Sequence, residues 1–207
     1  MDAITGPEAG VRPAKSAAER EAAAEALALA FAADPCWAHL LPDEGARAER
    51  LLAFFGEEIE SLTPDHREVW VTEDGGGAAI WAPPGSWRVP LGRTLGGAPR
   101  MREVFGRRLF LALRAGMRVD REHPRDPAHW YLDFLGVEPR RQGRGVGGAL
   151  LAPMLELCDR EGIPAYLGAS TERNRALYER NGFEMTGVFA MPGRGGPPIR
   201  KMWREPA

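Results

Sequence analysis

The sequence predicts an α/β (α+β) fold in which one β-sheet is flanked by helices. Segments with apolar residues at helical spacing alternate with short β-like runs, in the order α-α-β-β-α-β-α-β-α-β-β. A glycine-rich basic turn, 142–148, joins one of the strands to a helix. Because no repeat or shift in composition divides the chain, we expect a single domain over residues 1–207.

The first part of the chain predicts two helices. Residues 1–15 are expected to be irregular. The capping box Ser16-Ala-Ala-Glu19 begins the first helix, which we expect Pro35 to end. Apolar residues at helical spacing predict the second helix over residues 44–62.

A hairpin, a loop and a third helix are predicted next. Residues 67–72 and 78–81 are β-like, and Glu-Asp-Gly-Gly-Gly between them indicates a hairpin. The glycine- and proline-rich segment 83–99 is typical of a loop. Residues 100–118 carry an apolar stripe and predict one continuous helix.

The last part of the chain alternates strands and helices. We expect a strand over 129–137, a helix over 145–160 that stops at Gly162, a strand over 165–169, a helix over 172–181, and strands over 183–190 and 199–204.

The overall composition excludes several classes of protein. A formal charge of −2 provides no general field that would attract nucleic acid or a membrane surface. No apolar run approaches the ~20 residues of a membrane span, and the N-terminus lacks an apolar signal region. Cys36 and Cys158 form no CxxC pattern, so we expect reduced thiols in a cytoplasmic protein. The histidines lack metal-ligand spacing, so no metal is expected.

The turn 142–148, Gln-Gly-Arg-Gly-Val-Gly-Gly, has the chemistry of an anion site. Glycines allow a positive φ and a close approach of backbone to a phosphate. Unpaired amides at the start of the helix carry a partial positive charge. The turn comes too late in the chain for a dinucleotide fold, and it lacks the Gly-Lys-Ser/Thr of a P-loop.

Two motifs together identify a family resemblance. Gln142-x-x-Gly145-x-Gly147 after a strand, followed downstream by Asn174, Tyr178 and Gly-Phe183, resembles the GNAT N-acetyltransferase superfamily over about residues 129–185. Segments elsewhere are similar to the puromycin N-acetyltransferase branch, namely 29–35, 69–75, 130–132, 166–170 and 202–204. The resemblance implies a mixed, mostly antiparallel sheet that splays at the strand ending near Val137, and transfer of an acetyl group from acetyl-CoA to an amine.

The resemblance also implies the residues that bind acetyl-CoA. They are Leu135, Gly136, Val137, Arg141, Gln142, Gly143, Arg144, Gly145, Val146, Gly147, Gly148 and Asn174. For 135–137 the implied contacts come from the backbone. Asn174 suits a helix cap equally well.

Two residues are candidates for catalysis, one as a proton donor and the other as a general base. The resemblance places the Tyr178 hydroxyl near the CoA sulfur, where a phenol that is protonated at neutral pH can protonate the departing thiolate. Tyr178 also suits an aromatic anchor of its helix. Many relatives carry a glutamate where this chain has Gly168. Asp133, an acid inside an apolar strand, is the candidate general base, although a structural role or a water chain would also fit.

The acceptor is the least explicit part of the sequence. Trp37, Trp81, Trp87 and Trp130 are candidate walls for an aryl-bearing amine. We therefore predict a small-molecule N-acetyltransferase that acts by direct transfer in a ternary complex, antibiotic resistance being one such role. The alternatives are a protein N-terminal or lysine acetyltransferase, and a catalytically weak acetyl-CoA-binding regulator. The protein is expected to be a monomer or homodimer. The sequence does not decide whether the 83–99 loop closes over the acceptor.

Overall fold

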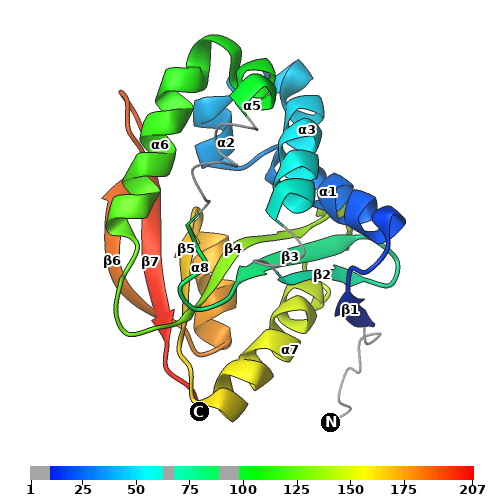
Figure 1. Cartoon of the computed structure of the whole chain (residues 1–207), viewed down its shortest axis with the longest axis vertical. Helices are drawn as coiled ribbons and strands as arrows, with labels where there is room; N and C mark the ends of the chain where they lie inside the picture. The colour runs from blue at the N-terminus through cyan, green and yellow to red at the C-terminus, as the bar shows by residue number, and fades with distance from the viewer. Residues whose placement is uncertain (1–9, 63–67, 89–97) are drawn as a thin grey trace.

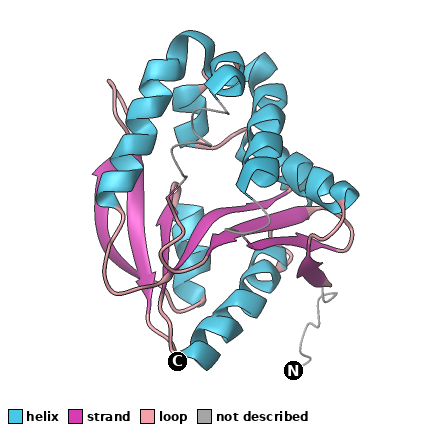
Figure 2. Ribbon diagram, viewed as in Figure 1, coloured by secondary structure: helices cyan, strands magenta, loops and turns pink. Residues whose placement is uncertain are grey.

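The computed structural model describes residues 10–62, 68–88 and 98–207, which build one seven-stranded sheet with helices on both faces (Figures 1 and 2). The strand order is β1-β2-β3-β4-β5-β7-β6. Expectations for residues 1–9, for Arg67 and for most of the 83–99 loop fall outside the described residues.

The strands follow the predicted order, and β1 is an additional strand within the segment 1–15 that was expected to be irregular. They are β1 (Val11–Pro13), β2 (Glu68–Thr72), β3 (Gly77–Ala82), β4 (Trp130–Val137), β5 (Ala165–Ala169), β6 (Glu184–Ala190) and β7 (Pro198–Arg204). Neighbouring strands pair antiparallel except β4 and β5, which are parallel. The predicted class, a mixed and mostly antiparallel sheet flanked by helices, is confirmed.

The helices are α1 (Ala17–Phe31), α2 (Pro35–Leu40), α3 (Glu44–Leu62), α5 (Ala98–Phe105), α6 (Leu109–Glu122), α7 (Val146–Glu161) and α8 (Glu172–Arg180), with 3-10 turns η1 (Gly106–Arg108) and η2 (Pro139–Arg141). The capping box at Ser16 is formed. In the described part of the chain none of the helices combines the length and the apolar character that crossing a membrane requires.

Two helical predictions were wrong in detail. Pro35 does not merely end a helix, because it is the first residue of α2, and Asp34 caps that helix. Proline suits this position since its missing N–H would have no partner there. The single helix predicted over 100–118 is instead divided at Gly106, where φ is +49°.

Two apolar clusters cover the two faces of the sheet. One lies under α1 and α3, with Leu27, Leu51 and Phe55 fully buried. The other packs α7 against the opposite face, around Trp81 and Leu150. In Figure 1, α1 and α3 lie above the sheet and α7 lies below it.

The sheet splays along β4, as the family resemblance implies. β4 and β5 pair at three positions, Trp130 with Ala165, Tyr131 with Tyr166 and Leu132 with Leu167. Beyond Leu132, β4 stays paired with β3 while β5 diverges. Asp133 is an extra residue in the β3–β4 register, because Trp81 faces Leu132 and Ile80 faces Phe134. Such a bulge bends a strand, and this one stands where the two strands part.

Candidate active site

The turn after β4 is tied to the end of that strand. Gln142 donates from Nε2 to the carbonyl of Val137 at 2.9 Å. Gly143 and Gly145 have φ of +77° and +83°, a region that residues with a Cβ avoid. Gly145 is the N-cap of α7 and makes no side-chain cap bond, so no side chain of its own competes for the first amides of the helix. These amides are suited to an anion.

The two arginines of the turn have different surroundings. The Arg141 guanidinium is ion-paired with Asp74 and with Glu138, the latter at 3.2 Å. Its side chain lies where a side chain at position 76 would be, and Gly76 leaves that space open. Arg141 thus holds the turn against the β2–β3 hairpin, which the sequence did not predict. Arg144 is exposed.

The start of α7 lies close to α8. A Cβ on Gly147 would stand 3.0 Å from Leu177 and 3.9 Å from Leu135, so glycine allows this approach, whereas a Cβ on Gly148 would meet nothing. Leu135 lines the pocket described next, and Gly136 and Val137 are buried. Their backbones lie on the diverging part of β4.

The region where β4 and β5 diverge beyond Leu132 is called the splay. A pocket of about 680 Å³ extends from the helices into the splay. Its inner end is lined by Leu135, Gly168, Ser170, Asn174 and Tyr178. Its remaining walls come from α2, α3, α5, α6 and the last two strands. Leu135, Asn174 and Tyr178, predicted on the donor side, therefore line the same pocket as Trp37 and Trp87, whereas none of residues 142–148 lines it.

Aromatic side chains form much of the outer wall. Trp37 stacks on Phe105 with centroids 6.3 Å apart and contacts Phe54 edge-on at 4.7 Å. Trp87 stacks on His123 at 3.7 Å. Trp81 and Trp130 instead belong to the core on the other face, so two of the four candidate tryptophans line the pocket.

Tyr178 has the surroundings of an aromatic anchor of its helix. It is buried, contacts Phe183 edge-on at 5.9 Å and lines the pocket. Burial raises the pKa of its phenol, and the nearby charge of Asp34 raises it further. The phenol is therefore protonated at neutral pH, as a proton donor requires.

Asn174 is not the cap of α8. Thr171 caps that helix by accepting from the Asn174 amide at 3.1 Å. The Asn174 side chain is therefore available to the pocket, where its Nδ2 donates to Ser170 Oγ at 3.4 Å.

Asp34 is a pocket residue that the sequence reasoning missed. Its Oδ1 accepts from the amides of Cys36 and Trp37 at 2.8 and 3.3 Å, and its Oδ2 accepts from the Ser170 hydroxyl. Burial raises the pKa of this carboxyl, and the hydrogen bonds act in the opposite direction. The sequence indicated only the end of a helix at Pro35, and it did not connect Asp34 with Ser170, which lies 136 residues away.

Asp133 and His123 line the same pocket, and His129 lies behind His123. Asp133 is half-buried at the β4 bulge. His123 lines the pocket, with its Nε2 2.9 Å from Nε2 of His129. His129 is buried rather than on the surface; burial lowers its pKa, and its Nδ1 lies 2.7 Å from the Pro127 carbonyl. Among the described residues no group of three or more His, Cys, Asp or Glu could hold a metal ion.

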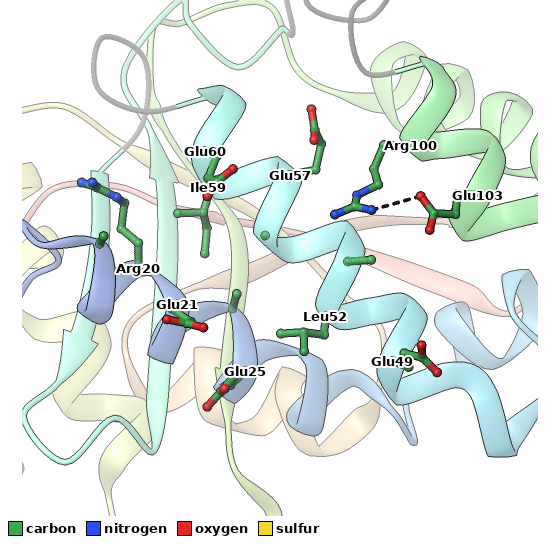
Figure 3. Close-up of a pocket in the computed structure, with 14 residues that line it drawn as sticks. Arg20, Glu21, Glu25, Glu49, Leu52, Glu57, Ile59, Glu60, Arg100 and Glu103 are labelled. Atoms are coloured by element: carbon green, nitrogen blue, oxygen red, sulfur yellow. Dashed lines mark hydrogen bonds and ion pairs between the residues drawn. The ribbon is translucent and has the colours of Figure 1, made fainter.

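A second depression, of about 760 Å³, lies between α1, α3 and α5 (Figure 3). It is lined by Arg20 and Arg100 and by Glu21, Glu25, Glu49, Glu57, Glu60 and Glu103. We call it the acidic groove. Arg100 is paired with Glu103 at 3.0 Å. Glu57 lines both the acidic groove and the pocket at the splay, so the two are neighbours across α3.

Comparison with known proteins agrees with this geometry. The family model "Acetyltransferase (GNAT) family" matches residues 110–183. An uncharacterized N-acetyltransferase of Schizosaccharomyces pombe is 35% identical over 98 residues, which are 47% of this chain and 40% of the relative. A mycothiol acetyltransferase of Beutenbergia cavernae is 38% identical over 71 residues, which are 33% of this chain and 24% of the relative. The matches thus span less than half of these curated relatives.

A solved structure is similar over nearly the whole chain. A Corynebacterium glutamicum protein described as "histone acetyltransferase HPA2 and related acetyltransferase" has a TM-score of 0.70 and 28% identity, covering 95% of this chain and 96% of that one. The seven-stranded sheet has the GNAT fold. The chain is therefore similar to GNAT acetyltransferases in sequence over residues 110–183, and to this neighbour over nearly its whole length.

Proposed function

We propose that this protein transfers the acetyl group of acetyl-CoA to the amine of an apolar small molecule, by direct transfer in a ternary complex. One observation carries the proposal: a single pocket joins the splay beside the glycine turn to an aromatic wall. A reaction between two bound substrates needs such a continuous space, because the reacting atoms must come within about 3–3.5 Å of each other.

The donor side fits acetyl-CoA. The amides at the start of α7 and in the turn, from Gly143 to Gly148, would hold the pyrophosphate. The diverging part of β4, from Leu135 to Val137, and Asn174 would contact the pantetheine arm. Acetyl-CoA supplies the activated acetyl group. Gln142 acts indirectly by tying the turn to β4.

Two side chains of the pocket have proposed catalytic roles. Tyr178, protonated in its buried position, donates a proton to the departing sulfur. Asp133 adds a negative charge to the wall of the pocket and stays a candidate base.

The lining of the pocket favours an apolar, positively charged acceptor. Apolar and aromatic side chains dominate its wall, and its carboxylates are Asp34, Glu57, Glu58, Asp120 and Asp133. Aromatic faces and carboxylates both favour an organic cation. The resemblance to the puromycin N-acetyltransferase branch agrees with an aryl-bearing amine and makes antibiotic resistance one form of the proposed role.

A second candidate acceptor is the lysine of a basic peptide. The acidic groove beside the pocket favours it, because six glutamates would attract such a peptide. The description of the Corynebacterium protein as a histone acetyltransferase agrees with this alternative.

Thiol release from acetyl-CoA tests the proposal. We expect release with aryl-bearing primary amines, with puromycin and 2-phenylethylamine as the first members of the panel, and none with lysine-containing basic peptides. Release with the peptides alone would favour the second candidate. Tight binding of acetyl-CoA with no release across the panel would indicate a binding protein without turnover. A cytoplasmic location and a monomeric or homodimeric state stay predictions from the sequence.

A further inference from the structure

The proposed reaction requires a group that takes the proton of the amine. Position 168, on the strand beside the splay, is glycine, and a Cβ there would already stand 3.0 Å from Ile199 Cγ2. An acidic side chain at this position would therefore have to displace Ile199. A base in this protein must come from another element.

A buried carboxylate lies at the inner end of the pocket, on the α1–α2 turn. Asp34 is 8% exposed, and its Oδ1 is engaged by the first amides of α2. Its Oδ2 accepts the hydroxyl hydrogen of Ser170, the first residue after β5. Ser170 Oγ in turn accepts from Asn174 Nδ2 at 3.4 Å. Asp34 and Asn174 thus fix the orientation of the Ser170 hydroxyl. Asp34, Ser170 and Asn174 all line the pocket.

We propose that Ser170 and Asp34 form a proton relay that takes the proton from the acceptor amine. This inference rests on the proposed function. Ser170 is the catalytic residue, because its Oγ retains a lone pair that can contact the amine. Asp34 is a positioning residue that acts through Ser170 and receives the proton in the end.

The relay balances the reaction. The bound ammonium group first releases one proton to solvent. The neutral amine nitrogen then forms a bond to the acetyl carbon, and the carbon–sulfur bond breaks. The amine proton passes to Ser170 Oγ while the Ser170 hydroxyl proton passes to Asp34 Oδ2. The phenol proton of Tyr178 passes to the sulfur. Solvent then returns the proton from Asp34 to Tyr178, so that the products are the amide and the free thiol.

Of the groups around Ser170, Asp34 is the one that can accept the proton. On α2, burial raises the pKa of the Cys36 thiol to about 12, so this thiol stays protonated. On α8, burial likewise keeps Tyr178 protonated. On β7, Arg200 is a permanent cation whose charge acts on Cys36, and it is ion-paired with Glu172. Burial raises the pKa of Asp34 itself, which brings a carboxylate closer to the basicity that a general base needs.

The test compares Asp34→Asn and Ser170→Ala with a matched control, Asp43→Asn. Asparagine caps a helix as well as aspartate does, so Asp34→Asn should keep α2 while removing the carboxylate. Asp43 is an exposed aspartate that accepts from the Ala46 amide at 3.4 Å, outside both depressions. The measurements are kcat against pH, acetyl-CoA affinity, and binding of 2-phenylethylamine and 2-phenylethanol without acetyl-CoA.

We expect Asp34→Asn and Ser170→Ala to lower kcat about 100-fold or more, with acetyl-CoA affinity unchanged. In the wild type and Asp43→Asn, kcat should fall at low pH as Asp34 is protonated, and in Asp34→Asn this fall should be absent. Asp34→Asn should weaken binding of the amine about tenfold and leave its alcohol isostere unchanged, a difference that a structural defect would not produce.

Three results would overturn the relay. Wild-type kcat and pH dependence in Asp34→Asn would exclude Asp34, and a loss confined to Asp133→Asn would move the base to the β4 bulge. Equal weakening of amine and alcohol would make Asp34 structural. The wild-type protein could also acetylate no amine of the panel and still bind the amine more tightly than the alcohol in a way that depends on Asp34. This result would refute the proposed acetyl transfer but not the contact of the amine with the Asp34–Ser170 pair.

Discussion

Helix α7 has a glycine in the left-handed backbone region at each end, and this allows a controlled test of the anion site. Gly145 at the N-cap has φ +83° and ψ −9°, and Gly162 at the C-cap has φ +65° and ψ +31°. A Cβ on either would meet no atom within 4 Å. Alanine at each position therefore changes backbone preference without a steric clash.

Both substitutions should destabilise the protein by a similar amount. An L-residue in this region costs about 1–2 kcal/mol. For a chain of this size we expect a fall in Tm of about 2–8 °C for either variant, measured by thermal unfolding of the ligand-free protein. Gly148→Ala, within the helix, should instead be neutral or stabilising, because a Cβ there meets nothing.

Of these two substitutions, only Gly145→Ala should weaken the binding of acetyl-CoA. If the turn shifts and one amide–phosphate hydrogen bond is lost, the cost of about 1.5–3 kcal/mol corresponds to a roughly 10- to 100-fold higher Kd. Gly162 lies at the far end of a 16-residue helix, about 24 Å away at 1.5 Å per residue. Its variant should bind with wild-type affinity in isothermal titration calorimetry. Equal Kd values for the two variants would refute the assignment of the anion to this turn.

Three further outcomes follow from other contacts. Tyr178→Phe should lower kcat about tenfold or more in the thiol-release assay and leave acetyl-CoA affinity and Tm unchanged; undiminished turnover would remove the donor role. Arg204 holds Asp159 with bonds of 2.6 and 2.8 Å and lowers its pKa. This contribution to stability is therefore full above the unfolded pKa of about 3.9 and lost as pH falls through the lower folded value. Asp159→Asn should cost about 1–2 kcal/mol in urea unfolding at pH 7, and a difference that persists at pH 2 would contradict the ion pair. Burial raises the pKa of Cys36 to about 12 and that of Cys158 to about 11, so both thiols should resist Ellman's reagent at pH 8 until urea unfolds the chain; rapid reaction of the native protein would contradict their burial.

Features set by neighbouring residues were predictable from the sequence. The Ser16 capping box and the strand–turn–helix at Gln142 to Gly148 depend on local backbone preferences, and both are formed. The same local reasoning failed where one residue type has two uses. Proline can end one helix or begin another. Here Pro35 is the first residue of α2, and Asp34 caps that helix.

Contacts between distant parts of the chain were not predictable. The ion pair of Arg141 with Asp74, 67 residues away, is one example, and the expected contact of Arg141 with a phosphate stays a prediction. The inner end of the pocket joins Asp34 to Ser170 across the splay, and no periodicity or motif encodes that pairing. Asp133 could be selected as unusual in an apolar strand, but its position in a bulge depends on the register with β3.

The short pairing of β4 with β5 also has a consequence for the order of folding. Strands β1 to β4 come from the first two thirds of the chain and β5 to β7 from the last, and three residue pairs join these halves of the sheet. This β4–β5 pairing, the seam of the sheet, can form only after the chain has crossed over through α7. That crossover closes a longer loop than a hairpin does. We therefore expect the seam to form late, so that a partly folded chain can contain both halves of the sheet and still lack the pocket.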